Sequence, residues 1–101
     1  MRLSVSPQVL AKLASKTPPV SREEVEQCFA NRCGVTLIDD RAEHASDPPT
    51  RWFIAETDFG RKLKIAFVPR GQDIHIRTAY DANRKWIGIY DSYHNGQQNG
   101  V

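Results

Sequence analysis

The sequence predicts a single α+β domain with the element order ααββββα: two N-terminal helices, a four-stranded antiparallel meander and a short C-terminal helix. Apolar residues recur at helical spacing as far as Gly34 and at strand spacing after it. The 101 residues are 40% hydrophobic and 26% charged, which is ordinary for one globular domain and excludes a large multi-lobed enzyme. We expect the domain to occupy residues 1–93 and a polar, flexible tail to occupy residues 94–101.

The first two helices are predicted from their capping residues. Ser6 can cap the first helix, with Pro7 at its first position, until a Thr-Pro-Pro sequence ends it. Ser21 and Glu24 form a capping box for the second helix, whose apolar residues follow a helical period. Cys28 belongs to that apolar set, so we expect it in the core rather than as a reactive thiol.

Four runs rich in β-branched and aromatic residues predict the strands, which span residues 35–39, 51–57, 61–68 and 74–80. Their succession with short connections favours an antiparallel meander. Residues 40–50 contain two adjacent prolines and are expected to form an irregular loop. After the last strand, Asp81 is expected to cap a third helix in which Trp86, Tyr90 and Tyr93 share a face.

The last two strands predict which side chains share a face of the sheet. Their apolar positions must face the core together, which requires cross-strand pairs such as Ile65 with Ile76. The side chains that then share the opposite face are Lys62, Lys64, His75 and Arg77, with Ala66 and Ala79 as small neighbours.

We call the face that carries Lys62, Lys64, His75 and Arg77 the cationic face. The loop before the third strand determines which side chains of the second strand also lie on it. The sequence Asp58-Phe59-Gly60 suits a three-residue hairpin in which glycine takes the left-handed conformation. That register places Trp52, Ile54 and Glu56 on the cationic face, with Glu56 opposite Lys62. A four-residue loop would reverse these assignments.

Charge is distributed unevenly along the chain, although the formal net charge is only +2. Residues 51–85 carry eight Lys and Arg against four Asp and Glu, and residues 20–50 carry three against seven. A basic segment suits a polyanion such as RNA, although dispersed surface charges are the alternative interpretation. The candidate RNA-binding residues in the basic segment are Arg51, Trp52, Lys62, Arg84 and Lys85.

The cationic face would carry the groups that cleave RNA without a metal or other cofactor. A base must remove the 2′-hydroxyl proton, an acid must protonate the leaving 5′-oxygen, and cations must stabilise the charged phosphorane. Glu56 and His75 are the candidate base and acid, and Lys64 and Arg77 are the candidate phosphate contacts. Trp52, expected to be exposed, could stack on an unpaired base.

Several segments resemble BrnT-like toxins, which are small bacterial ribonucleases with a RelE-like fold. The likeness covers roughly residues 20–85. It rests on the two short helices, on the apolar strand that follows the hairpin turn, and on three short motifs: Arg51-Trp52-Phe53-Ile54, Gly60-Arg61-x-Leu63 and Ile74-x-Ile76-Arg77-Thr78-Ala79-Tyr80. The resemblance implies an RNA-cleaving sheet face with Arg77 and Lys64 near its centre, and a DNA-binding antitoxin as partner. Tyr80 stands where the family usually has Arg; it would serve as a phenolic acid or stacking group, or activity is lost.

The sequence is also compatible with other functions. The same sheet face could hold a protein partner without catalysis, as in a phage or host regulatory module. Small proteins labelled ADP-ribosyl-dinitrogen-reductase hydrolases are also similar to residues 37–44, 47–50 and 52–57. Those hydrolases are large helical dimetal enzymes, and this chain is too short for that architecture. The common Walker, GxGxxG, GxSxG and HExxH motifs do not occur.

Two further expectations concern metal binding and location. The acidic stretch matches neither an EF-hand nor a zinc pattern, so we expect a solvated loop there; its residues are Asp39, Asp40, Glu43, His44 and Asp47. No apolar run reaches the roughly 20 residues that span a bilayer, and the first residues lack the apolar stretch of a signal peptide. We therefore expect a cytoplasmic protein with no membrane partner.

Overall fold

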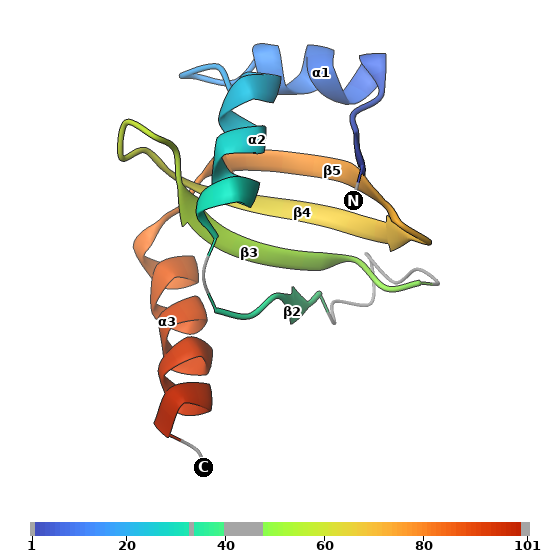
Figure 1. Ribbon diagram of the computed structural model, residues 1–101. Coiled ribbons are helices and arrows are strands. Elements are labelled where there is room, and N and C mark those ends of the chain that lie inside the picture. Colours follow the sequence, from blue (N-terminus) through green and yellow to red (C-terminus); the bar gives the residue numbers. More distant parts are fainter. Residues whose placement is uncertain (1, 33, 40–47, 100–101) are drawn as a thin grey trace.

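A five-stranded mixed sheet in the order β1-β5-β4-β3-β2 forms the centre of the fold, with three helices packed around it in the part of the chain that is described. The computed structural model describes residues 2–32, 34–39 and 48–99 (Figure 1). The strands are β1 (Arg2–Ser4), β2 (Leu37–Ile38), β3 (Arg51–Glu56), β4 (Lys62–Arg70) and β5 (Asp73–Asp81). The helices are α1 (Pro7–Ala14), α2 (Arg22–Asn31) and α3 (Arg84–Asn99).

The predicted α+β class and the antiparallel meander are confirmed for β2 to β5, but the sheet has one strand more than the sequence predicted. This strand, β1, pairs with β5 in parallel, with Leu3 opposite Ile74. A strand of three residues is too short to show a period of two, so the sequence carried no signal for it.

The capping predictions hold for the first two helices. The Ser6 hydroxyl accepts a hydrogen bond from the Val9 amide at 3.2 Å, and the Ser21–Glu24 capping box is complete. The predicted third helix is present as α3, but its predicted cap is wrong, because Asn83 rather than Asp81 accepts a hydrogen bond from the first turn.

The C-terminal part of the chain also differs from expectation. Helix α3 continues through Asn99, so the backbone of residues 94–99, which composition predicted to be a flexible tail, is helical. Residues 100 and 101 lie outside the described residues.

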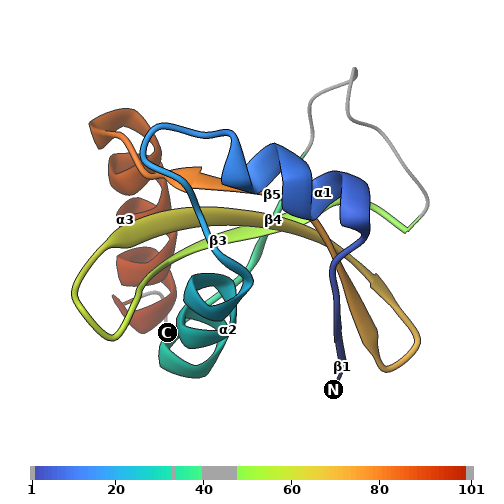
Figure 2. The ribbon, with the colours of Figure 1, turned by 90° about the horizontal axis from the view of Figure 1, so that it is seen from above.

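The two faces of the sheet are covered by different helices. Helix α2 packs on one face, where Phe29 makes edge contacts with Phe53 and Phe67 at centroid distances of 4.8 and 5.5 Å. Helix α3 contacts the other face, where Trp52 lies against Trp86. Helix α1 lies beside β5 (Figure 1), and the view from above places α2 to one side of the strands (Figure 2).

Cys28 belongs to the core under α2, as predicted, because its side chain has no solvent exposure. Burial raises the pKa of this thiol to about 12. Cys28 is therefore a structural residue rather than a nucleophile at neutral pH.

The β3–β4 hairpin has the predicted three-residue loop. Gly60 has a φ of +86°, the left-handed conformation that glycine adopts without strain. Ala55 pairs with Leu63 and Glu56 with Lys62. Trp52, Ile54 and Glu56 consequently share a sheet face with Lys62 and Lys64, as the sequence predicted.

The pairing of β4 with β5 changes register in the middle of the sheet. Ala66 pairs with Thr78, whereas the next β4 residue, Phe67, pairs with Ile76. Arg77 is thus one extra residue in β5, as in a β-bulge.

Because of this bulge, two details of the predicted pairing are wrong. Ile65 pairs with Ala79 and not with Ile76, so Ala79 is a fully buried core residue rather than a neighbour of the cations. Tyr80 instead pairs with Lys64 and shares its face.

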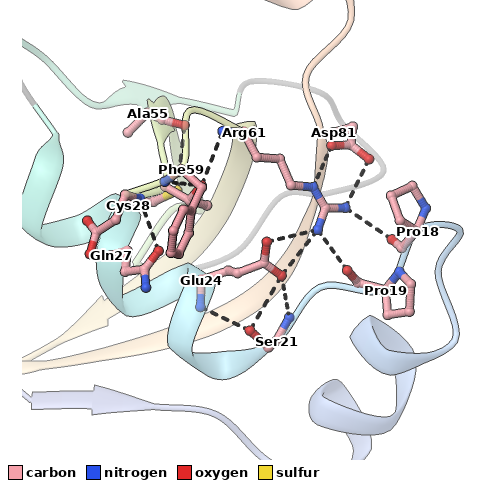
Figure 3. Close-up of polar contacts among 12 residues, drawn as sticks. Pro18, Pro19, Ser21, Glu24, Gln27, Cys28, Ala55, Phe59, Arg61 and Asp81 are labelled. Atoms are coloured by element: carbon pink, nitrogen blue, oxygen red, sulfur yellow. Dashed lines mark hydrogen bonds and ion pairs between the residues drawn. The ribbon is translucent and has the colours of Figure 1, made fainter.

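One guanidinium group joins four separate segments (Figure 3). The Arg61 guanidinium forms two parallel hydrogen bonds to the Asp81 carboxylate, at 2.8 and 3.0 Å. It also donates to the Glu24 carboxylate at 3.0 and 3.1 Å and to the carbonyl groups of Pro18 and Pro19 at 3.1 and 2.7 Å. The side chain is 20% exposed, so water screens these bonds only partly.

The carboxylates at this junction titrate below their usual range. The hydrogen bonds from Arg61 hold the pKa of Asp81 below its ordinary value of 3.8. Burial alone would raise the pKa of Glu24, but hydrogen bonds from the Ser21 amide and from Arg61 outweigh burial and lower it below 4.5.

We predict that Arg61→Ala lowers the free energy of unfolding by about 2 to 4 kcal/mol, because it leaves two carboxylates without their guanidinium partner. Urea unfolding followed by circular dichroism measures the change. The control is Arg70→Ala, at an exposed position, which should change stability by less than about 0.5 kcal/mol. Equal effects of the two substitutions would contradict the role of Arg61.

The lowered pKa values also predict a pH dependence. A carboxyl group whose pKa is lower in the folded than in the unfolded chain stabilises the fold at any pH above its unfolded-state pKa. This contribution is lost as the pH falls through the folded-state pKa. Stability should therefore fall as the pH drops below 4.5 and then below 3.8. Urea titrations across this range should give a shallower pH dependence for Arg61→Gln than for the unsubstituted protein; identical slopes would exclude Arg61 as the cause.

Candidate basic pocket

Lys64 is a buried lysine enclosed by aromatic rings. Its side chain is only 3% exposed. Its Nζ lies 3.5 Å from the centre of the Trp86 ring and 4.8 Å from that of Trp52, and it donates a 2.9 Å hydrogen bond to the Tyr80 hydroxyl. Ring faces and a phenol oxygen thus replace water around this ammonium group, which a purely aliphatic core could not do.

Lys64 and Tyr80 form one wall of a small cavity of about 180 Å³, which we call the basic pocket. The residues that line it are Lys12, Asp39, Thr50, Lys64, Ala66, Arg77, Thr78 and Tyr80. The set combines two ammonium groups, a guanidinium group, a phenol and one carboxylate. Such a set favours an anionic ligand and includes groups that can transfer a proton.

Four elements bring these side chains together. Lys64 and Ala66 alternate with core residues along β4, and the β5 bulge turns both Arg77 and Tyr80 to the same side. Lys12 comes from the exposed side of α1. Asp39 directly follows β2, where its amide donates to the Thr50 carbonyl at 2.8 Å.

A second lysine lies near Tyr80. Lys16 Nζ is 5.4 Å from the centre of the tyrosine ring, on the side where both residues line another cavity of about 340 Å³. Tyr80 is therefore close to one ammonium group from the segment after α1 and to another from β4.

Three of the five predicted catalytic residues, Lys64, Arg77 and Tyr80, line the basic pocket, and the other two do not. Glu56 pairs with Lys62 near one end of β4, whereas His75 pairs with Val68 six residues further along. Six residues of extended chain span about 20 Å, so these two side chains cannot serve as base and acid on one phosphate.

The predicted RNA-binding residues do not form one surface. Lys62 and Glu56 line a cavity of about 530 Å³ on one side of α3, and Arg51 and Trp52 line another of about 530 Å³ on the opposite side. Arg84 and Lys85 are exposed at the start of α3.

The prediction that Trp52 is an exposed stacking surface is wrong. Trp52 is only 5% exposed because the α3 residues Trp86 and Tyr90 pack against it, at centroid distances of 5.3 and 5.9 Å. The shared aromatic face of the third helix was visible in the sequence, but which strand residue it would cover was not.

Sequence reasoning missed Lys12, Asp39 and Thr50 as pocket residues. Lys12 looks like any solvated lysine on an amphipathic helix, and Asp39 looked like part of an acidic loop. The other residues of that predicted loop lie outside the described residues; they are Asp40, Glu43, His44 and Asp47.

Neither a metal centre nor a membrane span is found in the described chain. Within residues 2–32, 34–39 and 48–99, no three His, Cys, Asp or Glu side chains come together in a way that could hold a metal ion. Among the helices of these same residues, none combines the length and apolar character needed to cross a bilayer.

Comparisons of this chain with protein-family models, with curated proteins and with solved structures gave no match. Any assignment of function therefore depends on the geometry of the basic pocket.

The burial of Lys64 predicts a difference in chemical reactivity between two neighbouring lysines. In native protein, an amine-reactive acylating reagent should modify the exposed Lys62 at least about tenfold faster than Lys64, because local opening must precede reaction at Lys64. Mass spectrometry of peptides after short labelling times measures both rates. Trp86→Ala should raise the Lys64 rate and leave the Lys62 rate unchanged, and equal rates in the unsubstituted protein would contradict the enclosure.

Proposed function

We propose that this protein is a metal-independent endoribonuclease whose active site is the basic pocket. The observation that carries the proposal is the position of the Tyr80 hydroxyl, 2.9 Å from Lys64 Nζ, in a cavity that Arg77 and Asp39 also line. A phenol, a carboxylate and several cations at one small site match the requirements of RNA cleavage by the 2′-hydroxyl group.

The size and charge of the pocket support a phosphodiester group as its ligand. At about 180 Å³ it is smaller than the 300 to 1,000 Å³ typical of sites that enclose a whole small molecule. Arg77 can bind two phosphate oxygens at once, and the Lys12 ammonium adds a second positive charge. Both cations would be favoured further as the phosphorane gains negative charge.

The proposed reaction assigns one group to each proton. The Asp39 carboxylate accepts the 2′-hydroxyl proton while the 2′-oxygen forms its bond to phosphorus. The bond from phosphorus to the 5′-oxygen breaks, and the Tyr80 phenol donates its proton to that oxygen. The Lys64 ammonium, already hydrogen-bonded to the phenol oxygen, stabilises the resulting phenolate. The products are a 2′,3′-cyclic phosphate and a 5′-hydroxyl end.

The resemblance to BrnT-like toxins extends the proposal to a biological role. A bacterial toxin with a RelE-like fold would be silenced by a DNA-binding antitoxin encoded beside it, and Tyr80 would take the place of the family's arginine as a phenolic acid. Expression of the protein in bacteria should then arrest growth, and co-expression of the adjacent gene should relieve the arrest. Unimpaired growth would count against the toxin role and leave the chemistry to be tested separately.

We predict that the purified protein cleaves single-stranded RNA in the presence of a chelator, because protein side chains supply every charge and proton that the reaction needs. Arg77→Ala should reduce kcat/KM at least tenfold, about 1.4 kcal/mol. Tyr80→Phe, which retains the ring and removes the acid, should reduce it by about 100-fold or more. Labelled oligonucleotides resolved on denaturing gels give the rates and identify the cyclic phosphate.

The control for these variants is Glu56→Gln, which changes a carboxylate on the same sheet face but outside the basic pocket. It should leave kcat/KM within about twofold of the unsubstituted value. Full activity of Tyr80→Phe would exclude the proposed acid. RNA binding without any cleavage would instead favour the non-catalytic module.

A further inference from the structure

A larger cavity adjoins the basic pocket between β2 and α3. We call this cavity of about 530 Å³ the aromatic slot. One wall comes from Trp86, Ile89 and Tyr93 of α3, and the other includes Leu37 and Ile38 of β2. Figure 1 shows α3 passing the β2 edge of the sheet.

The α3 wall of the slot presents a continuous apolar and aromatic surface. Residues 86, 89 and 93 follow the i, i+3, i+7 spacing of one helix face. Tyr93 is 59% exposed and Ile38, on the opposite wall, is 51% exposed, so both walls of the slot are open to solvent. Facing apolar walls of this kind suit a flat ring that stacks on an aromatic side chain.

The aromatic slot and the basic pocket are adjacent. Two residues, Asp39 and Lys64, line both cavities. Arg51 also lines the slot, where its guanidinium donates to the Thr36 hydroxyl at 3.4 Å. A ligand that fills both cavities would therefore combine a planar apolar group with an anionic group one short linkage away.

We propose that the aromatic slot binds one unstacked nucleobase of single-stranded RNA while the adjoining phosphate occupies the basic pocket. This inference rests on the proposed function and adds the site that recognises a base of the substrate. Bases inside a duplex are stacked and paired and could not enter the slot, so the protein selects single strands. The cations at the boundary favour a nucleotide over an uncharged apolar side chain of a protein partner.

The test measures binding separately from cleavage. The probes are a fluorescent 2′-O-methyl oligoribonucleotide, which lacks the attacking hydroxyl, and an abasic oligonucleotide of the same length and charge. Tyr93→Ala should weaken binding of the base-bearing probe by about tenfold and leave the abasic probe unaffected, because only the first probe has rings to stack. Arg77→Ala should weaken binding of both probes.

The matched control is Phe59→Ala, which removes an exposed aromatic ring from the β3–β4 hairpin, outside the slot. It should change neither affinity. Tyr93→Phe should retain the affinity of the unsubstituted protein for the base-bearing probe, since stacking needs the ring and not the hydroxyl.

The outcomes separate the two proposals. If the unsubstituted protein cleaves no RNA but Tyr93→Ala weakens binding of the base-bearing probe alone, the endoribonuclease is overturned and the base-binding slot is supported. If the unsubstituted protein cleaves RNA but binds the base-bearing and abasic probes with equal affinity, the endoribonuclease is supported and the slot is overturned. Equal weakening of both probes by Tyr93→Ala would also overturn the slot.

Discussion

The extra residue at Arg77 determines which face of the sheet the later side chains of β5 occupy. With a regular ladder from the β4–β5 turn onward, the pairing of Phe67 with Ile76 would place Tyr80 on the core face. The bulge reverses the alternation, so that Ala79 enters the core and Tyr80 turns towards Lys64. One local irregularity thus completes both the packed face under α2 and the polar face that carries the basic pocket.

The polar junction around Arg61 supports this arrangement. Asp81 follows Tyr80 directly and is held by two parallel hydrogen bonds from Arg61. The same guanidinium binds the first turn of α2 and the carbonyl groups of Pro18 and Pro19. The end of β5 is therefore held against the segment that follows α1. That segment supplies Lys16 beside the Tyr80 ring, and α1 itself supplies Lys12 to the basic pocket. Fold stability and pocket geometry depend on the same contacts.

Lys64 contributes both to the packing of α3 on the sheet and to the basic pocket. A buried ammonium group costs free energy unless its environment replaces water, and here two indole rings and a phenol oxygen do so. The same contacts hold Nζ at the boundary of the aromatic slot and the basic pocket. In the proposed reaction, the ammonium group would need little reorganisation to stabilise negative charge on Tyr80 or on a phosphate, which is the basis of electrostatic preorganisation.

The sequence by itself determined the elements with strong local signals: the two capped helices, the three long strands and the Gly60 hairpin, together with the face shared by Lys62 and Lys64. Each depends on a side chain acting on its own backbone or on its immediate neighbour, so it is visible without the rest of the chain. Only the tertiary structure decided the strand β1, the bulge at Arg77, the burial of Trp52 and the arrival of Lys12 and Asp39 beside Tyr80. These features depend on contacts between segments far apart in the chain, and such contacts leave no periodic trace in the sequence.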